Sequence, residues 1–190
     1  MEQNFINRIN KLLRGRSVFL IGMMASGKSK TGPKLAELLK YKFIDVDILV
    51  EKVSKTSIEL IFQKEGEDFF RQLETQCLQE IIKIPSTVVS TGGGIILRKE
   101  NWGILRQGIV VWLDINQEVA LERLKMQNNI RPFFQGADLK KKYIDIFNLR
   151  KELYSQADIR IQVKNESIEE ISNKIISEIN NKIGLNLDQP

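Results

Sequence analysis

Residues 22–29 read Gly-Met-Met-Ala-Ser-Gly-Lys-Ser and fit the phosphate-loop pattern G-x-x-x-x-G-K-[ST]. The short apolar run at residues 17–21 comes directly before this loop and is typical of a buried strand. Residues 30–40 follow it, with leucines and an alanine at roughly helical spacing. Glycines let successive backbone N–H groups curl around phosphate oxygens, and the next helix points its positive end at them. The stretch therefore predicts a nucleoside triphosphate site on a strand–loop–helix unit.

The side chains of this loop have separate predicted tasks. Lys28 would reach the outer phosphates, and the Ser29 hydroxyl would ligate Mg²⁺. The alternative is a glycine-rich turn that matches the pattern by chance, which the strand before it and the helix after it disfavour. The predicted nucleotide contacts in this region are Ala25, Ser26, Gly27, Lys28, Ser29 and Lys30.

Composition narrows the possible chemistry. The chain has 190 residues, of which 42% are hydrophobic and 28% charged, as is ordinary for a globular domain with a substantial core. The net charge of +5 suits a nucleic-acid binder or an enzyme that gathers arginines around phosphates, and no long basic run favours the first. The sequence contains no histidine and only one cysteine, Cys77, which we expect to be a buried structural thiol. Carboxylates are therefore the expected general bases.

Strand-like runs alternate with helical patterns along the chain. This order predicts an α/β fold, a five-stranded parallel sheet flanked by helices on both faces, with ligands at the carboxyl ends of the strands. The expected strands are residues 18–21, 43–45, 87–90, 109–113 and 158–163. The expected helices are residues 30–40, 58–83, 99–107, 117–126, 139–155 and 167–181.

Other segments surround this alternation. We expect residues 1–16 to form an N-terminal extension with a short amphipathic helix, residues 17–183 a single domain, and residues 184–190 a flexible tail. Residues 46–83 are mostly helical and too long for a simple crossover, so they are predicted to cover the substrate. The polar residues 126–138 are predicted to be a mobile lid, because loops of that length in compact domains usually serve a function or are disordered.

Asp45 and Asp47 follow the second expected strand and would lie at its carboxyl end. On an extended backbone the two carboxylates can share one side. One could hold Mg²⁺ through its water shell, while the other accepts a proton from a substrate hydroxyl. Helix capping is the alternative for this pair, because aspartate is favoured where a helix begins, and Asp47 could both cap and act.

The helical pattern after residue 58 has one apolar face and a predicted break at Gly66. Its apolar residues are Ile58, Phe62, Phe69, Leu73, Cys77 and Ile81. Arg71 and Glu74 stand three residues apart, which permits a solvated ion pair on the helix surface. Arg71 also follows two phenylalanines, so its guanidinium could instead lie against an apolar wall and bind a carboxylate.

Two further features stand near expected strand ends and in the polar loop. Residues 91–94 read Thr-Gly-Gly-Gly directly after the third expected strand, which indicates either a backbone that a ligand approaches closely or a flexible turn. Arg131 precedes Pro132 in the expected lid, and Arg150 lies on the following helix. A lid arginine over a transferring phosphoryl group can raise the rate by ~10³-fold or more, although a lone loop arginine is more often simply solvated.

Taken in order, these motifs resemble the shikimate kinase family. They are the phosphate loop, the Asp-x-Asp pair, Phe-Arg-x-x-Glu at residues 70–74, the triple glycine, Arg131-Pro132, and Arg150 with Leu153-Tyr154 and Ala157-Asp158. The resemblance covers about residues 17–180. It implies the P-loop kinase fold, ATP as co-substrate with Mg²⁺, and phosphorylation of the 3-hydroxyl of shikimate.

The resemblance also implies a role for each matching residue. Asp47 would bind the reacting hydroxyl as base or orienter, and Lys28 and Arg131 would stabilise charge on the transferring phosphoryl group. Ser29 and Asp45 would hold Mg²⁺, and Arg131 would also contact ATP. The implied shikimate contacts are Arg71 and Arg150 on the carboxylate, Gly93 on a ring hydroxyl through its backbone, Phe62 and Phe70 beside the ring, and Glu74 as a brace for Arg71.

The chain departs from the family in the nucleotide-binding part. The family often has a further arginine early in the lid that contacts ATP, and either Arg123 or Lys125 could take that place here. The segment expected to contact adenine, near residues 164–167, contains no sharp motif.

Other classes of protein share some of these features. A gluconate kinase or nucleoside monophosphate kinase would share the phosphate loop and lid but lack this combination of motifs. A catalytically silent relative would be expected to lose Lys28, Asp47 or Arg131, and a nucleic-acid-binding ATPase would need a clustered basic face. The expected partners are thus shikimate and ATP, without nucleic acid or membrane, and the expected form is a cytoplasmic monomer.

Overall fold

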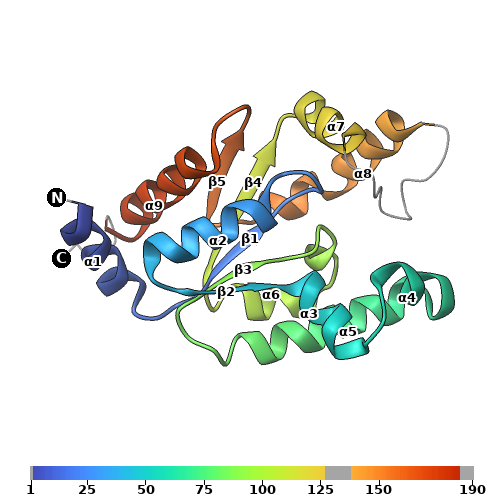
Figure 1. The fold of residues 1–190 in the computed structure, drawn as a ribbon, viewed down its shortest axis with the longest axis horizontal. Helices are drawn as coiled ribbons and strands as arrows, with labels where there is room; N and C mark the ends of the chain where they lie inside the picture. The colour runs from blue at the N-terminus through green and yellow to red at the C-terminus, as the bar shows by residue number, and fades with distance from the viewer. Residues whose placement is uncertain (1, 127–137, 185–190) are drawn as a thin grey trace.

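The computed structural model describes residues 2–126 and 138–184. A five-stranded parallel sheet in the order β2-β3-β1-β4-β5 forms its centre (Figure 1). The strands are β1 (Val18–Ile21), β2 (Lys42–Asp45), β3 (Thr87–Ser90), β4 (Ile109–Ile115) and β5 (Ile159–Val163). β1 pairs with β3 on one side and β4 on the other, so the loop that follows β1 lies between the carboxyl ends of both neighbours. The α/β fold predicted from the sequence is confirmed.

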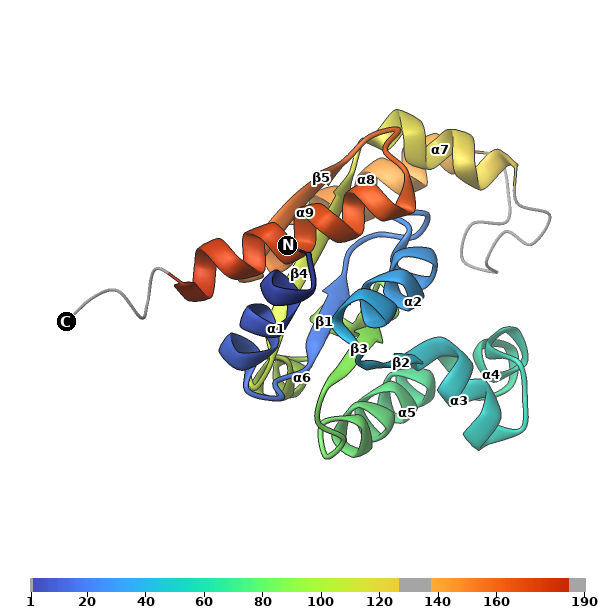
Figure 2. The same ribbon diagram turned by 60° about the vertical axis from the view of Figure 1, so that its left-hand side comes forward.

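Helices cover both faces of this sheet (Figures 1 and 2). On one face α2 and α9 pack against each other, and α1 contacts both. On the other face α6 contacts α5 and the short 3₁₀ helix η1, which also contacts α8. The helices are α1 (Glu2–Leu13), α2 (Lys28–Leu39), α3 (Val46–Ser54), α4 (Ile58–Lys64), α5 (Gly66–Ile81), α6 (Lys99–Leu105), α7 (Gln117–Lys125), α8 (Leu139–Tyr154) and α9 (Ile168–Gly184), and η1 is Ile95–Leu97.

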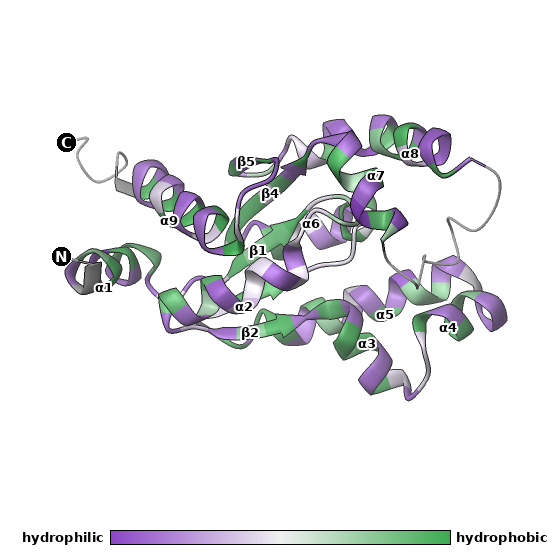
Figure 3. Ribbon diagram, turned by 45° about the horizontal axis from the view of Figure 1, so that its top comes forward, coloured by the Kyte–Doolittle hydropathy of each residue, from purple (hydrophilic) through white to green (hydrophobic). Residues whose placement is uncertain are grey.

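Burial along the strands follows from these layers. All four residues of β1 are buried, because the central strand of a parallel sheet is covered on both faces. The edge strand β5 instead alternates, with Ile159, Ile161 and Val163 buried and Arg160 and Gln162 exposed. In Figure 3 β1 and β4 are coloured mainly hydrophobic, whereas the surrounding helices alternate in polarity. The loops at the carboxyl ends of the central strands are therefore attached to strands that are buried in the core.

The N-terminal helix packs on the same core. Ile9 and Leu13 of α1 are completely buried, and the Asn10 side-chain amide donates to the Leu39 carbonyl at 3.0 Å. Both apolar residues belong to the buried cluster that includes the central strands. The boundary between an extension at residues 1–16 and a domain at residues 17–183 stays a prediction.

The backbone around Asp45 and Asp47 differs from the predicted extended segment. The chain turns helical at Val46, and Asp45, not Asp47, caps α3. Its Oδ1 accepts hydrogen bonds from the N–H groups of Asp47 and Ile48, at 3.0 and 3.4 Å. These bonds satisfy N–H groups that a helix start leaves unpaired, which explains why α3 begins directly at the end of β2. Asp47 therefore lies in the first turn of a helix.

The predicted helix over residues 58–83 is divided into α4 and α5. The break falls at Gly66, as expected, and its φ of 82° lies in the left-handed region that favours glycine. The predicted apolar face was wrong at one position, because Phe69 is 40% exposed whereas Phe70 is buried. The buried face of α5 is turned toward the row of Phe70, Glu74 and Leu78. β4 also extends two residues beyond the predicted end, to Ile115.

Some predictions fall outside the described residues. Residues 127–137, which include Arg131 and nearly all of the expected lid, are among them, as are residues 185–190 of the expected tail. Of the helices in the two described ranges, none combines the length and the apolar character needed to span a bilayer.

Candidate functional site

The phosphate loop joins the carboxyl end of β1 to the amino end of α2. Ala25 and Gly27 have positive φ angles of 60° and 93°, which curl the backbone so that successive N–H groups can face a common centre. Among the described residues no side chain caps the amino end of α2, and its first turn contains no acidic residue. The first N–H groups of α2 and the positive end of its dipole can therefore act on an anion.

Lys28 is held inside this loop. Its ammonium donates to the carbonyl oxygens of Gly22 and Met23, both at 2.8 Å, and to Ser26 Oγ at 3.2 Å. The side chain is buried, with an exposed fraction of 7%. The loop's own acceptors thus fix the positive charge at the place where phosphate oxygens would bind.

Ser29 and Asp45 bring two oxygen donors together from different elements. Ser29 Oγ donates to Asp45 Oδ2 at 2.6 Å and lies 3.3 Å from Ser90 Oγ at the end of β3. Because Asp45 Oδ1 caps α3, Oδ2 is the oxygen directed at the phosphate loop. Within residues 2–126 and 138–184 no group of three or more acidic or cysteine side chains could hold a metal. A hydroxyl and one carboxylate nevertheless suit Mg²⁺, which takes most of its ligands from water and phosphates.

The triple glycine after β3 is packed against charged side chains. A Cβ atom on Gly92 would collide with the Glu74 carboxylate and lie 2.9 Å from Asp47 Oδ1. A Cβ atom on Gly94 would collide with the Arg71 guanidinium. The missing side chains therefore let these acidic and basic groups reach the backbone, and the alternative of a flexible turn does not describe this segment.

Gly93 connects this segment to the phosphate loop. A Cβ atom placed there would lie 3.4 Å from the Gly22 carbonyl oxygen and 3.7 Å from the Met24 nitrogen. The Gly93 carbonyl accepts from Tyr154 Oη at 2.6 Å and from Arg150 Nη1 at 3.3 Å. These two donors occupy the lone pairs of the carbonyl, so the group that Gly93 can offer to a ligand is its N–H.

Arg71 forms a buried ionic cluster rather than a solvated pair. Its Nη1 donates to Glu74 Oε2 at 2.5 Å, and its Nη2 and Nε donate to Glu67 Oε1 at 2.8 and 3.2 Å. The Glu74 side chain is completely buried, and that of Arg71 is 12% exposed. Burial lowers the pKa of Arg71, but Glu74 and then Glu67 raise it more, so the pKa lies above its ordinary value. The guanidinium thus stays charged where it lies against Gly94.

Aromatic rings stand beside this cluster. Phe62 of α4 and Phe70 of α5 have ring centroids 4.9 Å apart at an interplanar angle of 42°. The Arg71 Cζ lies 5.0 Å from the Phe70 centroid. Phe70 is almost completely buried and Phe62 is half-buried, so Phe62 offers an accessible ring surface that Phe70 supports from behind.

Arg123 joins the phosphate loop to the segment after β5. Its Nη1 donates to the Ala25 carbonyl at 3.2 Å, and its Nη2 donates to the Lys164 carbonyl at 3.3 Å. Of the two residues that the sequence left open at this place, Arg123 is therefore the one that contacts the phosphate loop. The contact also brings the segment expected to bind adenine next to the loop.

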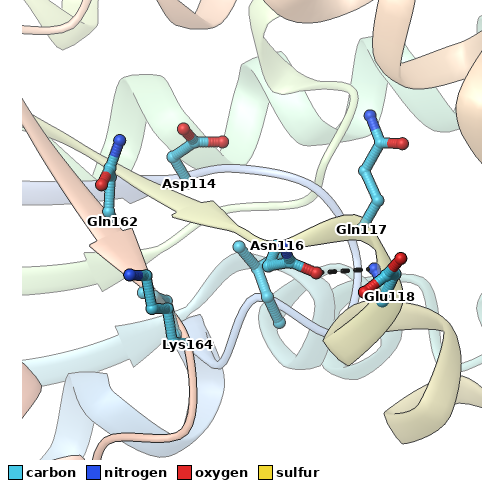
Figure 4. Close-up of a pocket in the computed structure, with 8 residues that line it drawn as sticks. Asp114, Asn116, Gln117, Glu118, Gln162 and Lys164 are labelled. Atoms are coloured by element: carbon cyan, nitrogen blue, oxygen red, sulfur yellow. Dashed lines mark hydrogen bonds between the residues drawn. The ribbon is translucent and has the colours of Figure 1, made fainter.

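A polar pocket that no sequence motif indicated opens at the carboxyl ends of β4 and β5 (Figure 4). It has a volume of about 490 Å³. Asn116 accepts from the Glu118 N–H at 2.8 Å and thereby caps α7 at its rim. The lining residues are Asp114, Ile115, Asn116, Gln117, Glu118, Gln162, Val163 and Lys164. Two of the lining residues, Asp114 and Ile115, belong to the part of β4 that extends beyond the predicted strand.

Comparison with known proteins relates this geometry to one family. The family model described as shikimate kinase matches residues 24–180. This chain belongs to the shikimate kinase family. A shikimate kinase of Prochlorococcus marinus is 48% identical to it over 167 residues, which cover 87% of this chain and 88% of the relative. The family resemblance seen in the sequence is thereby confirmed.

Solved structures give the same result. A shikimate kinase from Acinetobacter baumannii, determined in complex with shikimate, matches with a TM-score of 0.85 and 32% identity, over 96% of this chain and 99% of that one. A gluconokinase from Sinorhizobium meliloti matches with a TM-score of 0.61 and 18% identity, over 93% and 98% of the two chains. At that identity the likeness to the gluconokinase shows a shared fold alone.

Replacing Gly94 by alanine tests the packing of the triple glycine. Gly94→Ala should raise the KM for shikimate by about tenfold or more, because the new methyl group displaces the Arg71 guanidinium, while the KM for ATP changes by less than about twofold. Gly103→Ala is the matched control, since a Cβ atom there meets no atom within 4 Å in the described structure. Steady-state kinetics with both substrates measures the effect. Equal KM values for shikimate in the two variants would contradict the packing role.

Proposed function

We propose that residues of the triple glycine and of α3, α5 and α8 hold shikimate against the phosphate loop while its 3-hydroxyl accepts the γ-phosphoryl group of ATP. The observation that carries this proposal is the position of Gly93, which lies against Gly22 and Met24 of the phosphate loop. The segment proposed to bind the phosphoryl acceptor thus lies directly against the loop proposed to bind the phosphoryl donor. Family membership supports the reaction itself.

The acceptor side suits a small anion that carries hydroxyl groups. Arg71 and Arg150 would bind its carboxylate, since guanidinium groups form paired hydrogen bonds with carboxylates. The N–H of Gly93 would bind a ring hydroxyl, because its carbonyl is already taken by α8. Phe62 would contact the ring, with Phe70 behind it, and Glu74 would hold Arg71 in place.

Asp47 would orient the reacting hydroxyl and accept its proton. The hydroxyl oxygen forms a bond to the γ-phosphorus as the bond from that phosphorus to the β,γ-bridging oxygen breaks, which leaves ADP. Lys28 would stabilise the negative charge that the phosphoryl oxygens carry during transfer. Because Asp45 caps α3 from the end of β2, the first turn that carries Asp47 has a fixed position relative to the loop.

The nucleotide would be held by the loop and its neighbours. Ala25, Ser26, Gly27, Lys28, Ser29 and Lys30 would contact its phosphates. Ser29 and Asp45 would hold Mg²⁺, Asp45 through water, and the ion would neutralise phosphate charge when bound. Arg131, outside the described residues, is proposed to close over the phosphates with the lid at residues 126–138, and a cytoplasmic monomer remains our expectation.

An acceptor comparison tests the proposed reaction. In a coupled assay of ADP release, shikimate should stimulate turnover far more than quinate, gluconate or AMP, because of the four only shikimate combines a carboxylate for Arg71 with a flat cyclohexene ring that can lie against Phe62. The full chain is assayed with ATP and Mg²⁺ at saturating concentrations. A rate that shikimate does not raise would overturn the proposed function.

Asp47→Asn tests the proton acceptor. We expect kcat to fall by about 10²- to 10⁴-fold, the usual contribution of general acid–base catalysis, while the dissociation constant of ATP stays within about twofold. Asp145→Asn is the control, because Asp145 is an exposed carboxylate on α8. Single-turnover kinetics and nucleotide titration measure the two quantities. If Asp47→Asn keeps a substantial part of the wild-type kcat, Asp47 has no such role.

A further inference from the structure

Tyr154 is a buried residue at the end of α8 that the motifs leave without a role. We propose that Tyr154 is a positioning residue whose hydroxyl fixes the Gly93 carbonyl, so that the Gly93 N–H faces the acceptor at a constant distance from Arg150. The inference rests on the proposed function of Gly93 and Arg150. It adds a residue that need not contact the substrate and acts through the backbone of the triple glycine.

The hydrogen bond itself is short and protected from water. Tyr154 Oη lies 2.6 Å from the Gly93 carbonyl oxygen, and the Tyr154 side chain is completely buried. Arg150 donates to the same oxygen from one helical turn earlier, at the longer distance of 3.3 Å. Residues four apart on a helix share one face, so α8 presents both donors to one carbonyl. The shorter bond is donated by Tyr154, which is uncharged. Arg150, which donates the longer bond, carries the charge that can bind a carboxylate.

The ring of Tyr154 has firm support. It stacks on Trp112 of β4 with centroids 5.8 Å apart and an interplanar angle of 17°. The Arg160 guanidinium lies 4.7 Å from the Trp112 centroid and donates to Asp114 Oδ2 at 2.6 and 2.9 Å. Aromatic pairs in offset stacking stabilise one relative position of the rings. The stacking on Trp112 of β4 therefore fixes the position of the Tyr154 hydroxyl. The hydrogen bond from that hydroxyl in turn fixes the Gly93 carbonyl.

Tyr143, a second buried tyrosine of α8, shows whether a buried hydroxyl on this helix must form a hydrogen bond. Tyr143 lies on the same helix and is also completely buried, but within the described residues its hydroxyl has no hydrogen-bond partner. Burial, followed by the nearby Tyr154 and Asp114, raises the pKa of Tyr143 above its ordinary value, so this hydroxyl stays protonated. Helix α8 thus accommodates a buried tyrosine hydroxyl without a partner, and burial by itself does not require the bond to Gly93.

Loss of the Tyr154 hydroxyl has a specific consequence for the acceptor site. The Gly93 carbonyl would keep only the hydrogen bond from Arg150, which would then have to hold the backbone and bind the substrate carboxylate at once. The Gly93 N–H would shift as well, because its nitrogen and the carbonyl carbon are bonded to the same Cα atom, which moves when the carbonyl is released. Shikimate binding should weaken, while the nucleotide contacts of residues 25–30 stay in place.

The test compares Tyr154→Phe with Tyr143→Phe in the full chain. Each variant removes one buried hydroxyl from α8 and keeps the ring. For Tyr154→Phe we expect the KM for shikimate to rise by about three- to tenfold, with less than about a twofold change in the KM for ATP. Tyr143→Phe should leave both KM values within about twofold of wild type. Equal kinetics for the two variants would overturn the proposal.

Acceptor analogues make the test specific to Gly93. The KM ratio of Tyr154→Phe to wild type is measured with shikimate and with its 4-deoxy and 5-deoxy analogues. The ratio should fall to about one for the analogue that lacks the hydroxyl bound by Gly93 and persist for the other. The same ratio for all three acceptors would show a general structural defect and overturn the proposal. If wild type shows no shikimate-dependent ADP release, the proposed function itself has failed instead.

Discussion

The proposed acceptor half of the site depends on the absence of side chains at Gly92 and Gly94. Because these positions lack Cβ atoms, the carboxylates of Asp47 and Glu74 and the guanidinium of Arg71 can approach the backbone after β3. Glu74 is completely buried, and a buried carboxylate is tolerated only with a close counter-charge. Arg71 supplies that charge, so the position of the arginine is set by a requirement of folding. We propose that the same position suits Arg71 to bind a carboxylate ligand.

The sheet explains why distant segments meet at this point. β2, β3 and β1 are neighbours in the sheet, so their carboxyl ends form one continuous edge. That edge carries the Asp45 cap, the triple glycine and the phosphate loop. The chain between β2 and β3 folds into α3, α4 and α5, which contact one another and return Arg71 to the same edge. One topology thus brings together both halves of the proposed two-substrate site.

Much of this could be predicted from the sequence, because the motifs are local and the strands are apolar. Every expected strand exists, and Gly66 does interrupt the helical segment as its backbone freedom suggests. The sequence did not show that Asp45, and not Asp47, caps α3, because the choice of capping residue depends on where β2 ends and the helix begins. The burial of Phe70 rather than Phe69 was missed because the side of α5 that faces the core depends on its packing against other elements, which the spacing of apolar residues does not determine.

Other features depend on contacts between residues far apart in the chain. Tyr154 reaches Gly93 only because α8 packs near η1, and Arg123 is distinguished from Lys125 by its contact with Ala25. No local pattern encodes either contact. The polar pocket at the ends of β4 and β5 likewise joins residues about 50 positions apart, such as Asp114 and Lys164. Sequence reasoning could name the parts of this site but not these connections.

We propose that Arg71, held in its ionic cluster beside the phosphate loop, binds the acceptor through the acceptor's carboxylate. Titration calorimetry of the full chain with shikimate and with shikimate methyl ester, which has the same ring and hydroxyls but no negative charge, tests it most directly. We expect one binding site per chain for shikimate and an affinity for the ester that is lower by about 10²-fold, because a charge-assisted hydrogen-bond pair is lost. Equal affinities for the acid and the ester would contradict it.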